Sequence, residues 1–299
     1  MQKDRLGSLI HLHFIVFIYG FTAILGKLIA IDSLSLVWYR MGLASVFILV
    51  YIRVSKFQLR VTRKTLLWFT FAGIVVALHW VTFFWAIKVS TVSIALAMMS
   101  TGAFFTALIE PIVFKRKVIG YELFFGLLVI IGLYLIFRVE SGYTQGMIIA
   151  LVSAFLVAIF SIINAKLVKK HKPSIISFYE LSLGTLFLTI LLGVRGSFNT
   201  DFFVLMPSDW WYLIILSLIC TSYAFIVSVK IMRVLTAYTV MLTNNLEPVY
   251  GILMAWAFFG TEEKMSPLFY VGALIILLTV IANGILKHKA SNKQRRLKD

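Results

Sequence analysis

The polar residues best suited to chemistry lie together in a long apolar segment near the C-terminus. Asn244, Asn245 and Glu247 fall near the middle of segment 234–261, and Pro248 follows them directly. Proline has no N–H, so the carbonyl of Asn244 would lose its helical hydrogen-bond partner. A carboxylate, two amides and a free carbonyl at one kinked turn would bind an ammonium group, a cation or a proton. The alternative is a structural kink that packs helices together.

Two further charged side chains lie inside apolar segments. Arg40 and Glu180 occupy nearly equivalent places in segments 34–52 and 173–194, about 9 and 10 Å from opposite ends at 1.5 Å per helical residue. These depths make a direct pair between them unexpected. Each side chain would instead face a central cavity or a gate, and the alternative is a buried pairing with another group.

His79, Trp80 and Tyr39 are uncharged candidates for the same cavity. His79 could relay protons, but a single histidine of this kind is more often a hydrogen-bonded packing residue. Trp80 and Tyr39 could line a cavity with their rings, or could belong to the aromatic belts that form where helices leave a bilayer.

The composition requires an apolar environment around the chain. Hydrophobic residues make up 61% of it and charged residues 13%, whereas a typical soluble domain has about 45–50% and about 25%. Such a surplus of apolar surface fits a lipid bilayer. A charge in lipid costs several kcal/mol, so intramembrane ionisable residues usually face a cavity or a partner. The polar residues above are therefore expected to surround a cavity between helices.

The elements that would position these residues are membrane-spanning helices. A bilayer core about 30 Å thick requires about 20 helical residues. Ten apolar windows come close to this length: 9–31, 34–52, 66–87, 89–109, 121–137, 146–165, 173–194, 210–229, 234–261 and 267–286. The sequence therefore predicts an all-α integral membrane protein with ten transmembrane helices, short links and no large soluble domain.

The distribution of basic residues predicts the orientation. The formal net charge is +16, and the lysines and arginines lie in the short segments between apolar windows. If the N-terminus is cytoplasmic and the helices alternate, most basic residues fall on the cytoplasmic side, including those after Leu286, as the positive-inside rule requires. Both termini are therefore expected in the cytoplasm. No aromatic-rich basic patch is present, so nucleic acid is not an expected partner.

An internal repeat relates the two halves of the chain. A shift of 145 residues places Lys88 on Arg233, and a shift of 140 places Tyr39 on Tyr179. The alternative is a chance alignment of apolar helices. Five helices per half would invert the second copy, as in many secondary transporters that bind substrate near the midplane. The predicted repeats are residues 1–141 and residues 142–299, the second with a basic cytoplasmic tail.

Motifs for other classes of protein are absent from the sequence. It contains no Gly-x-x-x-x-Gly-Lys-Ser/Thr, no His-Glu-x-x-His and no Gly-x-Ser-x-Gly motif. The single cysteine, Cys220, excludes an internal disulfide and a cysteine-rich zinc site. We expect no enzyme activity, no cofactor and no metal. A receptor or scaffold would usually carry a substantial loop or soluble domain, and none is predicted.

Several segments resemble the EamA branch of the drug/metabolite transporter superfamily. Leu246-Glu247-Pro248-Val249, within Val234–Gly260, is similar to the family's motif, and Ser100–Phe114 is similar to the corresponding stretch of the first half. The family often has Gly-Glu after the fourth and ninth helices. The second half nearly keeps it at Gly260-Thr261-Glu262, whereas the first half departs from it with Phe114-Lys115-Arg116.

The resemblance implies an exporter of amino acids or other metabolites that works by alternating access in a bacterial inner membrane. Its partners would be a small-molecule substrate, the lipid bilayer and a coupling proton. A passive channel and a carrier of another class of solute, such as a nucleotide sugar or drug, are the alternatives. The predicted substrate-binding residues are Glu247, Asn244, Asn245, Trp80, His79, Arg40, Glu180 and Tyr39.

Overall fold

The computed structural model describes residues 2–115, 120–235, 240 and 243–296, and within these ranges it contains helices and links but no strand. The α-helices are α1 (Gln2–Leu28), α2 (Ser33–Val54), α3 (Arg63–Val89), α4 (Val92–Met99), α5 (Gly102–Phe114), α6 (Gly120–Val139), α7 (Thr144–Leu167), α8 (Pro173–Val194), α9 (Pro207–Ser217), α10 (Ala224–Ile231), α12 (Glu247–Phe259) and α13 (Pro267–Arg296). Short helices are η1 (Ser141–Tyr143), η2 (Asp201–Phe203), η3 (Leu218–Tyr223) and η4 (Gly260–Glu263).

Seven helical stretches of the described chain are long and apolar enough to cross a membrane: Ile10–Leu28, Ser33–Val54, Arg63–Val89, Val92–Val113, Ser141–Leu167, Pro173–Val194 and Pro207–Ile231. Two shorter apolar helices, Phe124–Val139 and Pro267–Asn283, add to these. The predicted window 234–261 contains α12 and lies partly outside the described residues. These segments account for the predicted ten crossings, and helices suit them because a helix satisfies its own backbone polar groups in lipid.

Local sequence signals explain where many helices begin. The side chain of Asp32 caps α2 and accepts two backbone N–H bonds of 2.9 and 3.2 Å. Pro173 and Pro207 lie in the first turns of α8 and α9, where a missing N–H costs nothing. Ser266 accepts a backbone N–H bond of 3.3 Å in the first turn of α13, which begins at Pro267 as the sequence predicts.

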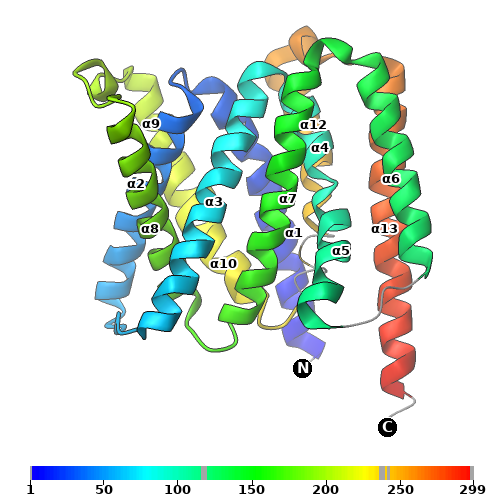
Figure 1. Cartoon of the computed structure of the whole chain (residues 1–299), viewed down its shortest axis with the longest axis horizontal. Helices are drawn as coiled ribbons and strands as arrows, with labels where there is room; N and C mark the ends of the chain where they lie inside the picture. Colours follow the sequence, from blue (N-terminus) through cyan, green and yellow to red (C-terminus); the bar gives the residue numbers. More distant parts are fainter. Residues whose placement is uncertain (1, 116–119, 236–239, 241–242, 297–299) are drawn as a thin grey trace.

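The two repeats run in opposite directions through the helical bundle. In Figure 1, α1 begins and α13 ends at the same end of the bundle, whereas the link from α6 to α7 lies at the opposite end. Helices α6 and α13 are counterparts and cross at Gly132 and Gly272. A Cβ built on Gly132 would lie 2.9 Å from the carbonyl oxygen of Gly272, and one on Gly272 would lie 2.8 Å from that of Gly132. The two glycines therefore approach each other reciprocally, which lets one helix of each repeat cross the other at close range.

A second reciprocal contact involves two of the residues that revealed the repeat. The hydroxyl of Tyr39 on α2 donates to the carbonyl of Phe202 in the link between α8 and α9, at 3.0 Å. The hydroxyl of its counterpart Tyr179 on α8 donates to the carbonyl of Leu59 in the link between α2 and α3, at 2.5 Å. Each tyrosine thus ties its own repeat to the other one.

Helix breaks occur at equivalent places in the two repeats. Ser100 and Thr101 separate α4 from α5, and Asn245 and Leu246 precede α12. The 145-residue shift aligns the first residue of α5 with Glu247, the first residue of α12. Broken helices at membrane depth are tolerated where the irregular backbone is buried in protein or lines a cavity.

The break before α12 corrects one detail of the sequence interpretation. We expected Pro248 to kink one continuous helix and free a carbonyl behind it. Instead, α12 begins at Glu247, and Pro248 lies in its first turn. A proline in the first turn needs no N–H partner, so it is better accommodated at a new helix start than inside a continuous helix.

Candidate functional site

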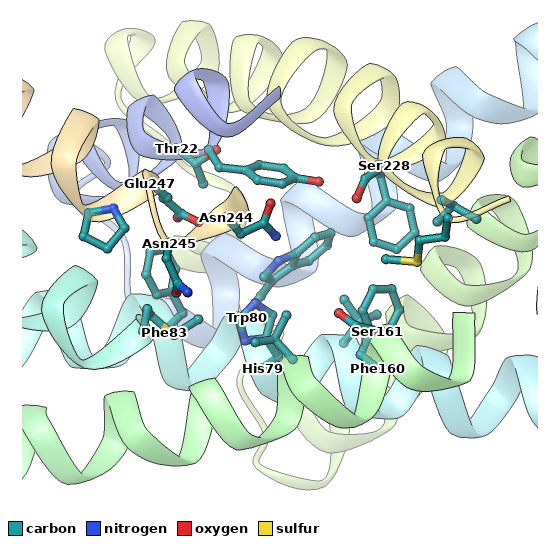
Figure 2. Close-up of a pocket in the computed structure, with 18 of the residues that line it drawn as sticks. Thr22, His79, Trp80, Phe83, Phe160, Ser161, Ser228, Asn244, Asn245 and Glu247 are labelled. Carbon is teal, nitrogen blue, oxygen red and sulfur yellow. The ribbon is translucent and has the colours of Figure 1, made fainter. Parts of the chain in front are cut away.

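A cavity lies between helices of both repeats, next to the break that precedes α12. It encloses about 880 Å³ of space between side chains, including the open space at its mouth. Figure 2 shows side chains converging on it from several helices. The polar lining residues are Tyr19, Thr22, Arg40, His79, Ser161, Ser228, Asn244, Asn245 and Glu247. The apolar lining residues are Val76, Trp80, Phe83, Met99, Val157, Phe160, Phe225, Val229, Met232 and Pro248.

Arg40 is held in the cavity by one hydrogen bond and by aromatic rings. Its Nε donates to Thr221 Oγ1 at 2.7 Å. Its guanidinium carbon lies 3.9 Å from the ring centroid of Trp80 and 5.4 Å from that of Phe84. Such stacking favours the planar guanidinium over a compact ammonium. The side chain is 1% exposed, and Nη1 has no hydrogen-bond partner among the described residues.

The π-helical segment η3 positions the partner of Arg40. In this segment the hydroxyl of Thr221 also donates to the carbonyl of Leu216, five residues earlier, at 2.7 Å. Such an extra residue in a helix often marks a functional site, because it turns side chains in a new direction. Here the widened turn directs Thr221 towards the guanidinium.

Glu247 and two nearby amides, those of Asn244 and Asn245, line the same cavity as Arg40. Glu247 is the first residue of α12, where the helix dipole favours negative charge. It makes no ion pair or hydrogen bond with another side chain in the described part of the chain. Asn244 Oδ1 and Asn245 Nδ2 also lack partners there. The cavity is therefore lined by a positively charged donor (Arg40), a negatively charged acceptor (Glu247) and amide groups of Asn244 and Asn245, all with unused hydrogen-bonding capacity.

Aromatic rings form an apolar wall in the same lining. The ring centroids of Trp80 and Phe225 are 5.8 Å apart, and those of Phe160 and Phe225 are 5.4 Å apart. An apolar surface with a few convergent polar groups is the usual design of a small-molecule site.

His79 lines the cavity but its ring nitrogen is used for packing. Its Nδ1 lies 2.8 Å from the hydroxyl of Ser153 and 3.0 Å from the Ser153 carbonyl oxygen. The Ser153 hydroxyl is also placed to donate to the His79 carbonyl, at 2.8 Å. These contacts join α3 to α7, which supports the packing alternative for this histidine.

Two of the eight predicted residues lie outside the cavity. Tyr39 makes the contact between repeats described above. Glu180 lies where α8 packs against α3 without space for a cavity, since a Cβ at Gly73 would lie 2.5 Å from the Glu180 carbonyl oxygen. The side chain of Glu180 is fully buried and meets Asn164. The expectation that Glu180 faces the central cavity is therefore corrected.

The other six predicted residues surround the one cavity: Glu247, Asn244, Asn245, Trp80, His79 and Arg40. The sequence analysis missed several hydroxyl groups of the lining, such as Tyr19, Ser161 and Ser228. Tyrosine and serine are common in membrane helices, so nothing in the sequence separates these three from packing residues. No group of three or more His, Cys, Asp or Glu side chains placed to hold a metal occurs within the described residues.

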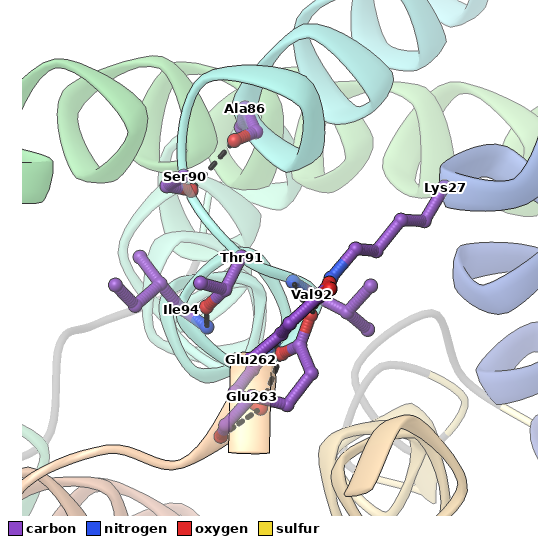
Figure 3. A network of polar contacts seen from close by, with 9 residues as sticks. Lys27, Ala86, Ser90, Thr91, Val92, Ile94, Glu262 and Glu263 are labelled. Atoms are coloured by element: carbon purple, nitrogen blue, oxygen red, sulfur yellow. Dashed lines mark hydrogen bonds and ion pairs between the residues drawn. The ribbon is translucent and has the colours of Figure 1, made fainter. Parts of the chain in front are cut away.

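A polar network, which we call the latch, closes the end of the bundle opposite the termini (Figure 3). Its centre is Glu263, a 1% exposed residue of η4. The Glu263 carboxylate accepts bonds from the N–H groups of Val92 (3.1 Å) and Ser93 (2.9 Å) at the start of α4, and from the Ser93 hydroxyl (2.8 Å). Lys27 at the end of α1 pairs with it at 2.9 Å and with the exposed Glu262 at 3.3 Å.

Further bonds join separate elements at the same end. Lys88 Nζ donates to the carbonyl of Ile29 at 2.8 Å, and the N–H of Ala30 donates to Asp209 Oδ1 at 3.1 Å. In the other direction, the cavity lining reaches Met232, just beyond the end of α10. The lining therefore extends towards the end of the bundle that carries the termini, whereas polar contacts tie the helices together at the opposite end.

Comparisons with known proteins identify the family. The family model of the EamA-like transporter family matches residues 8–138 and again residues 144–284. An uncharacterized transporter of Archaeoglobus fulgidus is 24% identical over 87% of this chain and 90% of its own length. A second one from this organism is 27% identical over 51% of this chain and 52% of its own length. A solved crystal structure shares the fold, with a TM-score of 0.69 at 13% identity, over 94% of this chain and 98% of that one. The chain is a multi-pass membrane protein and belongs to the EamA-like transporter family.

Proposed function

We propose that the protein is a secondary transporter that exports a small metabolite, such as an amino acid, by alternating access. One observation carries the proposal: a single cavity between the repeats presents a guanidinium and a carboxylate that act on each other electrostatically, and neither makes a close ion pair of 4.0 Å or less among the described residues. Two opposite charges that are buried near each other without direct contact are only partly compensated, which is unfavourable inside a protein. A solute that neutralises both charges at once would therefore be favoured.

An amino acid in its zwitterionic form has the required chemistry. Its carboxylate would bind the guanidinium of Arg40, whose Nη1 is unused, through charge-assisted hydrogen bonds. Its ammonium group would bind the carboxylate of Glu247 and the free Oδ1 of Asn244. An apolar side chain would rest on the aromatic wall, with Trp80 nearest to the guanidinium.

Alternating access would use the inverted repeats. Two packings of related halves can open the same midplane site first to one side and then to the other. In the present conformation the latch closes one end, and the cavity extends to the end that carries the termini. The positive-inside rule favours cytoplasmic termini, and the resemblance to the family favours a cell inner membrane, so the cavity would load from the cytoplasm. A coupling proton would supply the driving force.

Counterflow in proteoliposomes tests this proposal. Vesicles loaded with a mixture of the twenty common amino acids should accumulate a radiolabelled member of the mixture with saturable kinetics, which a channel does not produce. Glu247→Gln should abolish the counterflow while leaving the melting temperature unchanged, and Glu262→Gln, at a side chain that is 72% exposed, serves as the matched control. Undiminished counterflow by Glu247→Gln contradicts the role of the carboxylate. Unsaturable flux favours a channel, and saturable flux of a nucleotide sugar or a drug alone favours another class of solute.

A further inference from the structure

Glu180 is a carboxyl group buried in the bundle for which the cavity provides no role. It is 0% exposed, and its two oxygens lie 3.1 and 3.4 Å from one donor, the Nδ2 of Asn164 on α7. Asn164 is also 0% exposed, and its Oδ1 has no hydrogen-bond partner among the described residues. One neutral amide provides little stabilisation for an ionised carboxylate.

No cation compensates for a negative charge on Glu180 within the described residues. Arg40 of α2 lies in the cavity and is bonded elsewhere, and His79 of α3 is bonded to α7. Lys166 of α7 and Lys230 of α10 are exposed. The remaining basic groups on α2 and α3 lie near the ends of these helices: Arg53, Arg63, Lys64 and Lys88. The surroundings of Glu180 contain Asn164 as its hydrogen-bond partner and no charged group that acts on it among the described residues.

We propose that Glu180 and Asn164 form a proton-binding site, separate from the substrate cavity and occupied by a proton in this conformation. Burying an isolated ionised carboxylate is far more costly than burying a neutral carboxylic acid. A protonated carboxyl group has one donor and one acceptor, which match the Oδ1 and Nδ2 of an amide. The proton therefore also supplies the donor that Asn164 Oδ1 lacks.

A metal cation fits this site less well than a proton. Hard cations such as Ca²⁺ and Mg²⁺ take six or more oxygen ligands, many of them from carboxylates. At Glu180 the structure offers the two carboxyl oxygens and the free Oδ1 of Asn164. The carbonyl of Phe160 is already used by the Asn164 amide, at 3.3 Å.

The site lies one helical turn behind the wall of the cavity. Ser161 lines the cavity, and Asn164 follows it by three residues, so the two share one face of α7. On α3, Val76 lines the cavity and Gly73, one turn earlier, contacts the backbone of Glu180. One turn is about 5.4 Å. A modest displacement of α3, α7 and α8 would connect Glu180 to the cavity and let the proton leave.

Infrared spectroscopy of the protein in bilayers tests proton occupancy without any substrate. We expect the wild type to show the stretching band of a protonated carboxylic acid at neutral pH, shifted in deuterium oxide. Glu180→Gln should lose this band, and Glu247→Gln should retain it. Asn164→Leu should shift its frequency, because the amide partner is removed. If the glutamine variant folds poorly, Glu180→Asp provides the second test, because it retains a carboxyl group and should therefore keep a band. A spectrum unchanged by Glu180→Gln, or a band that disappears on addition of sodium chloride alone, overturns the assignment.

The link between this proton and transport rests on the proposed function, and a separate measurement tests it. In proteoliposomes, Glu180→Gln should lose the accumulation of labelled amino acid that an imposed pH gradient drives. Equal accumulation by wild type and variant overturns the coupling role. Failure of the amino-acid proposal would leave the infrared result unaffected, so the two failures can be distinguished.

Discussion

The latch around Glu263 offers a direct way to shift the protein between its two conformations. Glu263→Gln retains the size of the side chain and removes its charge. It would break the pair with Lys27 and leave one carbonyl oxygen for the N–H groups at the start of α4. Because these partners come from α1, α4 and η4, we expect the end of the bundle opposite the termini to open more often.

The size of the shift follows from burial. Breaking a buried ion pair costs about 3–5 kcal/mol. Lys27 is 24% exposed, and the substituted amide would keep one acceptor. We therefore expect a cost at or just below the lower end of this range, about 2–3 kcal/mol. At about 1.4 kcal/mol for each factor of ten, this changes the ratio of open to closed molecules by about 30- to 140-fold.

Cysteine labelling from one side of the membrane measures this ratio. Cys220→Ala removes the single cysteine, and Ser228→Cys then places one thiol in the cavity wall. A membrane-impermeant maleimide, added on the side opposite the termini, should label this thiol much faster when Glu263→Gln is present.

Glu262→Gln is the matched control for the latch. The side chain of Glu262 also pairs with Lys27, at 3.3 Å, but is 72% exposed, so its pair is worth about 1 kcal/mol or less. Labelling that rises equally in both variants, or in neither, would refute the assignment of Glu263 as the residue that holds this end closed.

Two further substitutions test the packing of the repeats and the recognition of the substrate. Gly132→Ala places a Cβ against the backbone of Gly272 and should destabilise the protein by about 1–3 kcal/mol in thermal unfolding, whereas Gly193→Ala, with nothing within 4 Å, should not; an unchanged melting temperature for Gly132→Ala would contradict the close crossing. Arg40→Lys loses the stacking on Trp80 and the two-pronged binding of a carboxylate, so amino-acid affinity should fall about tenfold or more; wild-type affinity in a binding titration would rule out this role.

The sequence predicts the fold well because a lipid bilayer permits few kinds of secondary structure. A segment of about 20 apolar residues in a bilayer has to form a helix to satisfy its backbone. The tyrosines at 39 and 179 also revealed the repeat, because a shared geometric role keeps the same side chain in both halves. The break between α4 and α5 was not predicted, since Ser100 and Thr101 carry no strong helix-breaking signal.

The sequence predicted those residues of the candidate site whose position in the fold follows from their charge alone. Arg40 and Glu247 stand out because a charge in an apolar segment needs a polar surrounding. Glu180 also has a polar surrounding, but this is the amide of Asn164 on a neighbouring helix and not the cavity. Which of the two a buried carboxyl group contacts depends on how the helices pack. Glu263 was missed because acidic residues are common in links between helices. Its partners at the start of α4 are distant in the chain, so its burial becomes visible only in the structure.

Binding of amino acids and of their singly charged analogues tests the central claim most directly. The account predicts that at least one amino acid raises the melting temperature of the purified wild type. The stabilisation should disappear with the N-acetyl analogue, which lacks the ammonium group for Glu247, and with the amide analogue, which lacks the carboxylate for Arg40. Analogues that stabilise the protein as well as the parent amino acid would contradict a cavity that recognises both charges.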